Sequence, residues 1–294
     1  DKYQLEKTKE NTASVVIKAK SDYEASLINK LPENPKLFYN YCRHFTKSSS
    51  TIDTLKVDDK LITDGDMKAE VLNSFFASVW VTEPSEESFP HLEDSCTDRI
   101  FDIVISADIV RIKLLKLKAN KSSGPDSIHA NVLRQVPEFD RPLTNLFRTS
   151  LATGVLPQDW KNANVTPVHK SGTRTSCNNY SPVSLTSQVC KIMEKVLLDQ
   201  LLIHVKKNNI LHCDQHGFQS NCSCVSQLIE CLIDWTENYD NGKETDIIYL
   251  DFSKAFDTVP HRRLIAKLRS VGIRGKVLNW IQSFLTNRKQ RVLL

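Results

Sequence analysis

Most of the apolar positions along the chain recur with the period of an amphipathic helix. Residues 4–29 carry a weak helical pattern that breaks at Leu31-Pro32. Asn34 and Pro35 are typical of the first residues of a helix, and residues 47–51 form a serine-rich link. A further helix is predicted after Asp66, which we interpret as its N-cap. The first part of the chain is therefore expected to be mostly helical.

An acidic, proline-containing stretch, Glu83–Asp98, is the best candidate for a domain boundary. Between this boundary and residue 240 the pattern predicts five helices and one short strand. The expected helices are Ser106–Leu117, Asp126–Val136, Asp140–Gly154, Ser187–Lys207 and Cys222–Tyr239, with Ser106, Asp126 and Ser187 as N-caps, and the strand is Asn164–Val168.

An unbroken apolar run, Ile247–Leu250, lies inside Thr245–Leu250 and is typical of a strand covered on both faces. This strand would end at Asp251, and ligands of α/β sheets bind at the carboxyl ends of strands. Local sequence alone favours a plainer interpretation, in which Asp251 is the N-cap of the next helix.

Composition indicates a folded, mainly helical α/β protein. The 294 residues are 40% hydrophobic and 25% charged, with a mean hydropathy of -0.34, and the length suggests two compact units. No apolar run approaches the ~18 residues that span a bilayer. The first residues lack the apolar region of a signal peptide, so we expect an intracellular fragment. Only 8 glycines are present, which disfavours glycine-rich nucleotide-binding folds.

Charge is distributed unevenly around a net value of +4. From His261 to Leu294 there are nine basic residues and no acidic one, so the rest of the chain is net negative. Such a cluster is expected on a surface that faces a polyanion, although a solvated helix face is the common alternative. The nine are Arg262, Arg263, Lys267, Arg269, Arg274, Lys276, Arg288, Lys289 and Arg291.

The 8 cysteines form no CxxC pair, so reduced thiols are expected. Five potential metal ligands lie close together in the sequence: His212, Cys213, His216, Cys222 and Cys224. The spacing of Cys222 and Cys224 is tighter than zinc sites normally use, which disfavours zinc.

The residues from Asp251 to His261 read Asp-Phe-Ser-Lys-Ala-Phe-Asp-Thr-Val-Pro-His. They resemble the first palm motif of reverse transcriptases from non-LTR retrotransposons of the jockey and CR1 kind. Four upstream blocks are similar to the finger motifs of that family and occur in the same order: 121–126, 160–170, 179–186 and 215–218. Residues 34–80 are similar to the connector that follows the endonuclease in such polyproteins.

The resemblance implies an α/β fragment of a right-hand polymerase, with fingers and a partial palm preceded by a mostly helical connector. Residues 1–105 would be the connector, and residues 106–294 the fingers and first palm motif, with the polymerase core from about residue 150. The implied partners are an RNA template, a DNA primer and dNTP, with no membrane. An endonuclease would lie upstream in the parent polyprotein, and the rest of the palm and the thumb downstream.

The resemblance also implies roles for particular residues. Asp251 would be the catalytic carboxylate and a ligand of Mg²⁺, with the Phe252 carbonyl as a second contact. Phe256 would reject a 2′-hydroxyl, and the backbone amides of Lys254, Ala255 and Phe256 would face the triphosphate. Asp257 we take as structural. The nucleic acid would be bound by Arg262, Arg263, Lys267, Arg269, Arg288, Lys289 and Arg291.

Several features depart from the family pattern. No acidic residue follows Asp257, so the family's later Asp-Asp pair is missing, and this chain is expected to be inactive alone. Ser181 and Gln219 stand where the family has arginine, and Cys222 and Cys224 replace a further arginine and a threonine. We therefore hypothesise a decaying genomic copy. The rival interpretations are an intron-encoded reverse transcriptase and a non-catalytic RNA-binding relic that uses its basic C-terminal segment.

Overall fold

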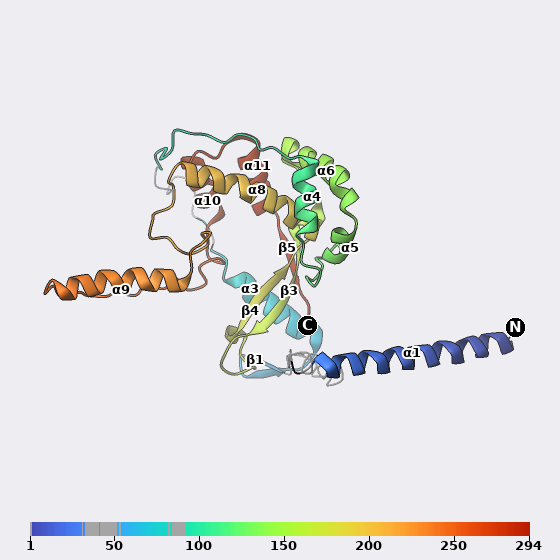
Figure 1. Ribbon diagram of the computed structural model, residues 1–294. Coiled ribbons are helices and arrows are strands. Elements are labelled where there is room, and N and C mark those ends of the chain that lie inside the picture. The colour runs from blue at the N-terminus through green and yellow to red at the C-terminus, as the bar shows by residue number, and fades with distance from the viewer. Residues whose placement is uncertain are drawn as a thin grey trace. The chain divides into compact units, whose positions relative to one another are not determined.

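The computed structural model describes residues 2–30, 32, 41, 52, 54–81, 83 and 92–294 (Figure 1). The chain divides into two compact units, residues 1–53 and 54–294. The first contains α1 (Lys2–Lys30), which confirms the helix predicted there. The helix predicted after Asn34 and the link at 47–51 lie outside the described residues. In the described ranges, no helix combines the length and apolar character that crossing a bilayer requires.

The second unit begins with an antiparallel hairpin of β1 (Leu55–Val57) and β2 (Lys60–Ile62), followed by α3 (Gly65–Ser78). The N-cap of α3 is Asp64, whose carboxylate accepts a hydrogen bond from the Met67 amide at 2.9 Å. The prediction that Asp66 caps this helix is therefore wrong. Asp66 already lies in the first helical turn, where an acidic side chain still interacts favourably with the helix dipole.

The remaining helices pack mainly against one another. They are α4 (Ala107–Leu115), α5 (Ala130–Gln135), α6 (Asp140–Thr153), α7 (Gln158–Lys161), α8 (Gln188–Lys207), α9 (Cys224–Asp240), α10 (His261–Ser270) and α11 (Gly275–Leu285), with 3₁₀ turns at Pro137–Phe139 and Cys177–Asn179. The predicted N-caps of α4 and α8 are confirmed, because Ser106 and Ser187 accept bonds from Ile109 and Cys190 amides. α6 ends as predicted at Gly154, with φ of 69°.

The helix predicted to start at Asp126 begins four residues later, at Ala130. Asp126 instead accepts a hydrogen bond from the Ile128 amide at 3.2 Å, within a turn. Ser127 has φ of 57°, a left-handed conformation that interrupts a right-handed helix. The Asp126 cap is therefore wrong, although the turn predicted at 121–126 is present.

A three-stranded sheet lies beside the helices, in the order β4-β3-β5. β3 (Asn162–His169) contains the predicted strand and pairs antiparallel with β4 (Tyr180–Leu185). β5 (Lys289–Val292) pairs parallel with β3, and α3 packs against it. The residues after β2 are thus part of the same unit as the fingers motifs, whereas the division predicted at residues 105 and 106 stays a prediction.

The hydrophobic core is formed by helices α4, α6, α8, α10 and α11 (Figure 1). Its fully buried side chains include Val110, Phe147, Ile192, Met193, Val277 and Trp280. The Trp280 indole donates to Ser150 Oγ at 3.0 Å, which satisfies its one polar group. The basic C-terminal segment therefore supplies part of the core as well as surface charge.

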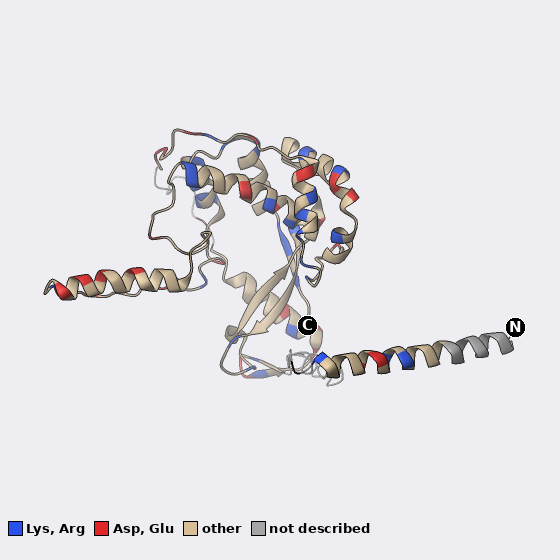
Figure 2. Cartoon of the chain, in the orientation of Figure 1, with Lys and Arg blue, Asp and Glu red and all other residues tan. Residues whose placement is uncertain are grey.

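The strand predicted at Thr245–Leu250 is wrong for this structure. The segment has no strand assignment, and Ile248 and Leu250 are 82% and 87% exposed. A strand that is apolar on both faces needs a paired neighbour and two covering layers, and the described residues supply none of them here. Helix α9, just before it, also has no buried residue and carries acidic side chains along its length (Figure 2).

Candidate functional site

Asp251 opens a loop of tight turns that runs to Thr258. Lys254 has φ of 51°, and its carbonyl accepts hydrogen bonds from the amides of Asp257 (2.9 Å) and Thr258 (3.1 Å). The next helix, α10, begins only at His261, after Pro260. Asp251 is therefore ten residues away from that helix, and the N-cap interpretation of Asp251 is wrong.

Two side chains of this loop contact aromatic rings from distant segments. The Phe256 ring packs edge to face on Phe218, with centroids 5.7 Å apart. The Lys254 ammonium lies 4.7 Å from the centroid of the Phe75 ring, in cation–π geometry. Phe218 belongs to the fourth fingers-like block and Phe75 to α3. The fold thus brings two of the motifs identified in the sequence together at Phe256, and it exposes Asp251 and Phe252.

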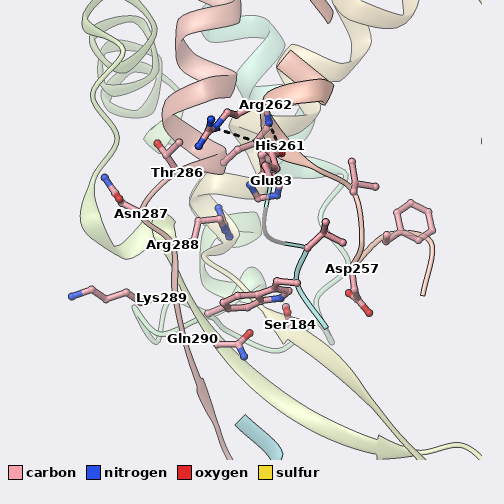
Figure 3. A pocket seen from close by; sticks show the side chains of 16 residues that line it. Glu83, Ser184, Asp257, His261, Arg262, Thr286, Asn287, Arg288, Lys289 and Gln290 are labelled. Carbon is pink, nitrogen blue, oxygen red and sulfur yellow. Dashed lines mark hydrogen bonds and ion pairs between the residues drawn. The ribbon is translucent and has the colours of Figure 1, made fainter. Parts of the chain in front are cut away.

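Beside the loop lies a pocket of about 640 Å³ (Figure 3). Five segments form its walls: the residues after α3, the strands β3 and β4, the loop with the start of α10, and the α11–β5 connection. Phe256 and Asp257 are the loop residues that line it, and Ser184 comes from β4. The other lining residues are Trp80, Val81, Glu83, Ala163, Val259, His261, Arg262, Leu285, Thr286, Asn287, Arg288, Lys289 and Gln290.

An ion pair fixes one wall of this pocket. Arg262 Nε lies 3.4 Å from Glu83 Oε2, and the Arg262 backbone amide donates to Glu83 Oε1 at 2.8 Å. Figure 3 shows the two side chains joined at the top of the pocket. Glu83 therefore offsets the charge of Arg262 and attaches the residues after α3 to the start of α10.

Arg288 supplies the cation inside the pocket. Figure 3 shows its side chain directed toward the pocket interior, whereas Lys289 points away to the outside. Arg288 Nη1 donates to the Phe284 carbonyl at 3.1 Å, and the guanidinium lies 4.5 Å above the Phe284 ring. Arg288 also acts on Glu194 of α8. Burial raises the pKa of the Glu194 carboxyl, and the positive charge of Arg288 partly opposes that rise.

Of the other basic residues predicted to bind nucleic acid, Arg262 and Lys289 also line this pocket, whereas Arg263, Lys267, Arg269 and Arg291 do not. Arg269 lines a smaller pocket of about 300 Å³ together with His261 and Arg262. Arg291 Nε donates to Asn164 Oδ1 at 2.8 Å, which connects β5 to β3. Arg263 and Lys267 lie on exposed positions of α10. The basic segment thus forms a charged surface of several parts rather than one groove.

Sequence reasoning did not identify Phe75, Trp80 and Glu83 as neighbours of the loop. The first part of the chain is net acidic, so no nucleic-acid contact was predicted there. The sequence does single out Trp80, because it is a large apolar residue just after α3 that does not extend the apolar pattern of that helix. Local pattern alone cannot tell which distant segment such a residue meets.

Ser181 and Gln219, where the resemblance implies arginine, take part in regular backbone structure. Ser181 is in β4, opposite Val168 of β3. The Gln219 amide donates to the Gln215 carbonyl within a turn. Neither residue lines the pocket.

The five potential metal ligands near residue 212 do not assemble as one site in the described structure. His216 is buried, with Nδ1 2.9 Å from Ser226 Oγ and Nε2 2.7 Å from Glu230 Oε2. These contacts attach the fourth fingers-like block to α9. His212, Cys213 and Asp214 are exposed neighbours, and the hydrogen bond to Asp214 raises the pKa of the Cys213 thiol.

Comparisons with known proteins agree with this arrangement of motifs. Residues 168–293 match the family described as reverse transcriptase (RNA-dependent DNA polymerase). The chain is 28% identical over 186 residues to the RNA-directed DNA polymerase from mobile element jockey of Drosophila melanogaster, which covers 63% of this chain and 20% of that protein. The corresponding jockey protein of Drosophila funebris is 26% identical over 198 residues, 64% of this chain and 21% of its own length.

A second kind of element also matches. The Pol polyprotein from type-1 retrotransposable element R2 of Popillia japonica is 26% identical over 173 residues, covering 58% of this chain and 23% of that protein. The chain thus spans about a fifth of the length of these curated relatives.

The chain is thus similar over residues 168–293 to the reverse transcriptase class of α/β polymerases, and its mixed helices and sheet fit a fragment of that class. Within that class it is similar to the non-LTR retrotransposon enzymes of the jockey and CR1 kind. The family acts on a nucleic-acid template and nucleotides and uses divalent metal ions. Asp251 and Asp257 offer exposed carboxylate oxygens, which are ligands that hard divalent cations prefer.

Proposed function

We propose that this chain supplies the fingers and the first palm motif of an RNA-directed DNA polymerase, which extends a DNA primer with dNTP on an RNA template. The observation that carries the proposal is the loop that begins at Asp251. The loop lies within the segment that matches the reverse transcriptase family, and a pocket lined by Arg288 lies beside it. Its Phe256 ring also contacts Phe218, which belongs to the fourth fingers-like block.

The loop residues have the chemistry that the reaction needs. Asp251 is the proposed ligand for Mg²⁺, which would neutralise the triphosphate and lower the pKa of the primer hydroxyl. The Phe252 carbonyl is a further proposed ligand. The amides of Lys254, Ala255 and Phe256 lie in a turn and would donate to phosphate oxygens. Phe256, whose ring contacts the Phe218 ring edge to face, is the proposed barrier to a 2′-hydroxyl.

The remaining roles follow from charge and order along the chain. Residues 1–105 are the proposed connector, with an endonuclease before it and the rest of the palm and the thumb after residue 294. Template and primer phosphates would meet the charged surface of the basic segment. Its proposed contacts are Arg262, Arg263, Lys267, Arg269, Arg288, Lys289 and Arg291.

A primer-extension assay tests the proposal. Since no acidic residue follows Asp257, we expect the 294-residue chain alone to add no dNTP to a primer on an RNA template with Mg²⁺. A chimera that carries the downstream palm and thumb of a jockey relative should extend the primer. Asp251→Asn in that chimera should abolish extension, whereas Asp257→Asn should reduce it much less. Extension by the Asp251→Asn chimera would contradict the role given to Asp251.

The alternative is a non-catalytic RNA-binding relic, favoured by Ser181 and Gln219 in place of arginines. Charge-assisted hydrogen bonds to phosphate contribute about 1.5–3 kcal/mol each. Restoring arginine at both positions in the chimera should therefore lower the KM for dNTP by roughly tenfold or more. An unchanged KM would argue against both the fingers assignment and the decay hypothesis.

A further inference from the structure

We propose that Trp80 is a stacking platform for an unpaired base of a nucleic-acid strand, and that Arg288 binds the neighbouring phosphate in the same pocket. The proposal rests on the proposed polymerase function, because it names the ligand of the pocket beside the Asp251 loop. It places a binding residue in the part of the chain that was expected to be only a connector.

Trp80 differs from the two tryptophans of the helical core. Trp160 and Trp280 are 3% and 2% exposed, whereas Trp80 is 56% exposed and lines the pocket. It follows α3 directly, and its backbone amide donates to the Ala77 carbonyl at 3.1 Å, which holds it at the helix end. An indole held with its ring exposed at a pocket wall suits a flat, partly apolar ligand.

Arg288 supplies the second element of the proposed site, a contact to phosphate. A guanidinium has five N–H donors, and the bond to Phe284 uses one of them. The Phe284 ring and Phe284 carbonyl hold the side chain on one side, so that the guanidinium is directed into the pocket (Figure 3). Proteins that bind single strands combine these two elements, a positive side chain for the backbone and an aromatic ring for the base.

The acidic residues of the pocket make stacking more important than charge. Glu83 is paired with Arg262, and Asp257 is exposed and would repel a phosphate placed next to it. The charges of Arg288 and Asp257 therefore balance inside the pocket, and only the outward-directed Lys289 leaves the lining residues with a net positive charge. Affinity in this pocket should depend on the indole to a larger extent than on the exposed faces of α10.

The lining residues favour a strand over a free nucleoside triphosphate. A triphosphate would need the metal proposed at Asp251, but Phe256 and Asp257 are the residues of the Asp251–Asp257 loop that line the pocket. The volume of about 640 Å³ fits one nucleotide with its base. Lys289 is directed outward beside Arg288 (Figure 3), so in this proposal it would contact the next phosphate of the strand.

The test is the binding of a labelled eight-nucleotide single-stranded RNA to the full 294-residue chain. Fluorescence anisotropy measures this binding at several salt concentrations. Trp80→Ala should weaken binding about tenfold, because a stacked base contributes roughly 1–3 kcal/mol. Trp80→Phe should retain most of the affinity. Trp235→Phe, a tryptophan change in α9 outside this pocket, is the matched control and should bind as the parent chain does.

Salt dependence separates the two roles. Trp80→Ala should leave the slope of log affinity against log salt unchanged, whereas Arg288→Gln should reduce it by about 0.7, the value of one phosphate contact on a single strand. Thermal unfolding of each variant checks that the fold is intact, and the salt slope of Arg288→Gln still tests the pocket if Trp80→Ala unfolds.

Three outcomes would overturn the proposal. The parent chain could fail to bind the RNA, Trp80→Phe and Trp80→Ala could both bind as tightly as the parent chain, or free dNTP could bind in a Trp80-dependent manner while the RNA does not. Primer extension by the chimera is measured separately. An active chimera with no effect at Trp80 would reject the stacking role and leave the polymerase assignment in place.

Discussion

Cys190 and Glu194 lie one turn apart on α8, and burial changes the proton affinity of both. Burial raises the pKa of the Cys190 thiol, and the nearby Glu194 charge raises it further. Burial also raises the pKa of Glu194, while its hydrogen bond with Cys190 and the charge of Arg288 act in the opposite direction. A desolvated carboxylate behind the pocket thus influences the stability of the helix that supports it.

Glu194→Gln should raise the melting temperature at pH 8. The Glu194 carboxyl has a higher pKa in the folded than in the unfolded protein. The folded protein therefore loses stability as pH rises from the unfolded pKa of about 4.3 to the folded pKa. The gain from the glutamine should therefore be full above the folded pKa and disappear near pH 4. Calorimetry across this range measures it, with Glu237→Gln on exposed α9 as control. A lower melting temperature at pH 8 would mean that the attraction of Arg288 outweighs desolvation.

At the scale of elements, helix boundaries follow side-chain caps and left-handed residues. Ser106 and Ser187 begin α4 and α8, and Gly154 ends α6. The Ser187 cap is buried. Gly124 of the first block lies so close to it that a Cβ added to Gly124 would be 2.5 Å from the Ser187 backbone nitrogen. The Gln188 amide also donates to the Ser122 carbonyl at 2.5 Å. The start of α8 therefore joins the first and third fingers-like blocks.

Ser187→Ala should lower the free energy of unfolding by about 1 kcal/mol, since the hydroxyl accepts a capping bond from the Cys190 amide. Urea denaturation measures the change. Ser176→Ala is a matched control, because Ser176 occupies the N-cap of a 3₁₀ turn without a side-chain capping bond. Its effect should stay within about 0.5 kcal/mol. Equal effects of the two substitutions would show that the Ser187 bond does not stabilise α8.

At the scale of the whole molecule, the basic segment has two roles that deletion cannot separate. Residues 261–294 include α10, α11 and β5, and they contribute Val277, Leu278 and Trp280 to the core. Removing them would expose that core as well as remove charge. Substitutions at exposed basic positions are needed to test the electrostatic role.

A triple variant, Arg263→Gln, Lys267→Gln and Lys289→Gln, should flatten the salt dependence of RNA binding. If each side chain contacts one phosphate, the slope of log affinity against log salt should fall by about 2 in total. Lys116→Gln, Lys118→Gln and Lys121→Gln change the net charge equally outside this segment and serve as control. Equal changes in the two variants would assign the binding to overall charge rather than to this surface.

Most helix positions, the Ser106 and Ser187 caps and the family motifs were readable in the sequence. These signals are local, because a cap acts within one turn and an amphipathic period repeats within a single helix. The wrong caps at Asp66 and Asp126 arose where several acceptors lie near one helix start, and backbone conformation chose among them. The order of the motifs also predicted the Asp251 loop as the place for chemistry, which stays a prediction.

Tertiary structure decided what surrounds that loop. The pocket takes walls from Trp80, Ser184, Phe256 and Arg288, which are separated by up to 208 residues along the chain, and no local period reports such a meeting. The same reason explains the wrong strand at Thr245–Leu250, since pairing depends on neighbours that a residue's own segment does not contain. Local sequence thus determined the elements and the candidate catalytic loop, whereas packing between distant segments determined the pocket, the burial of the basic segment and the partners of each charge.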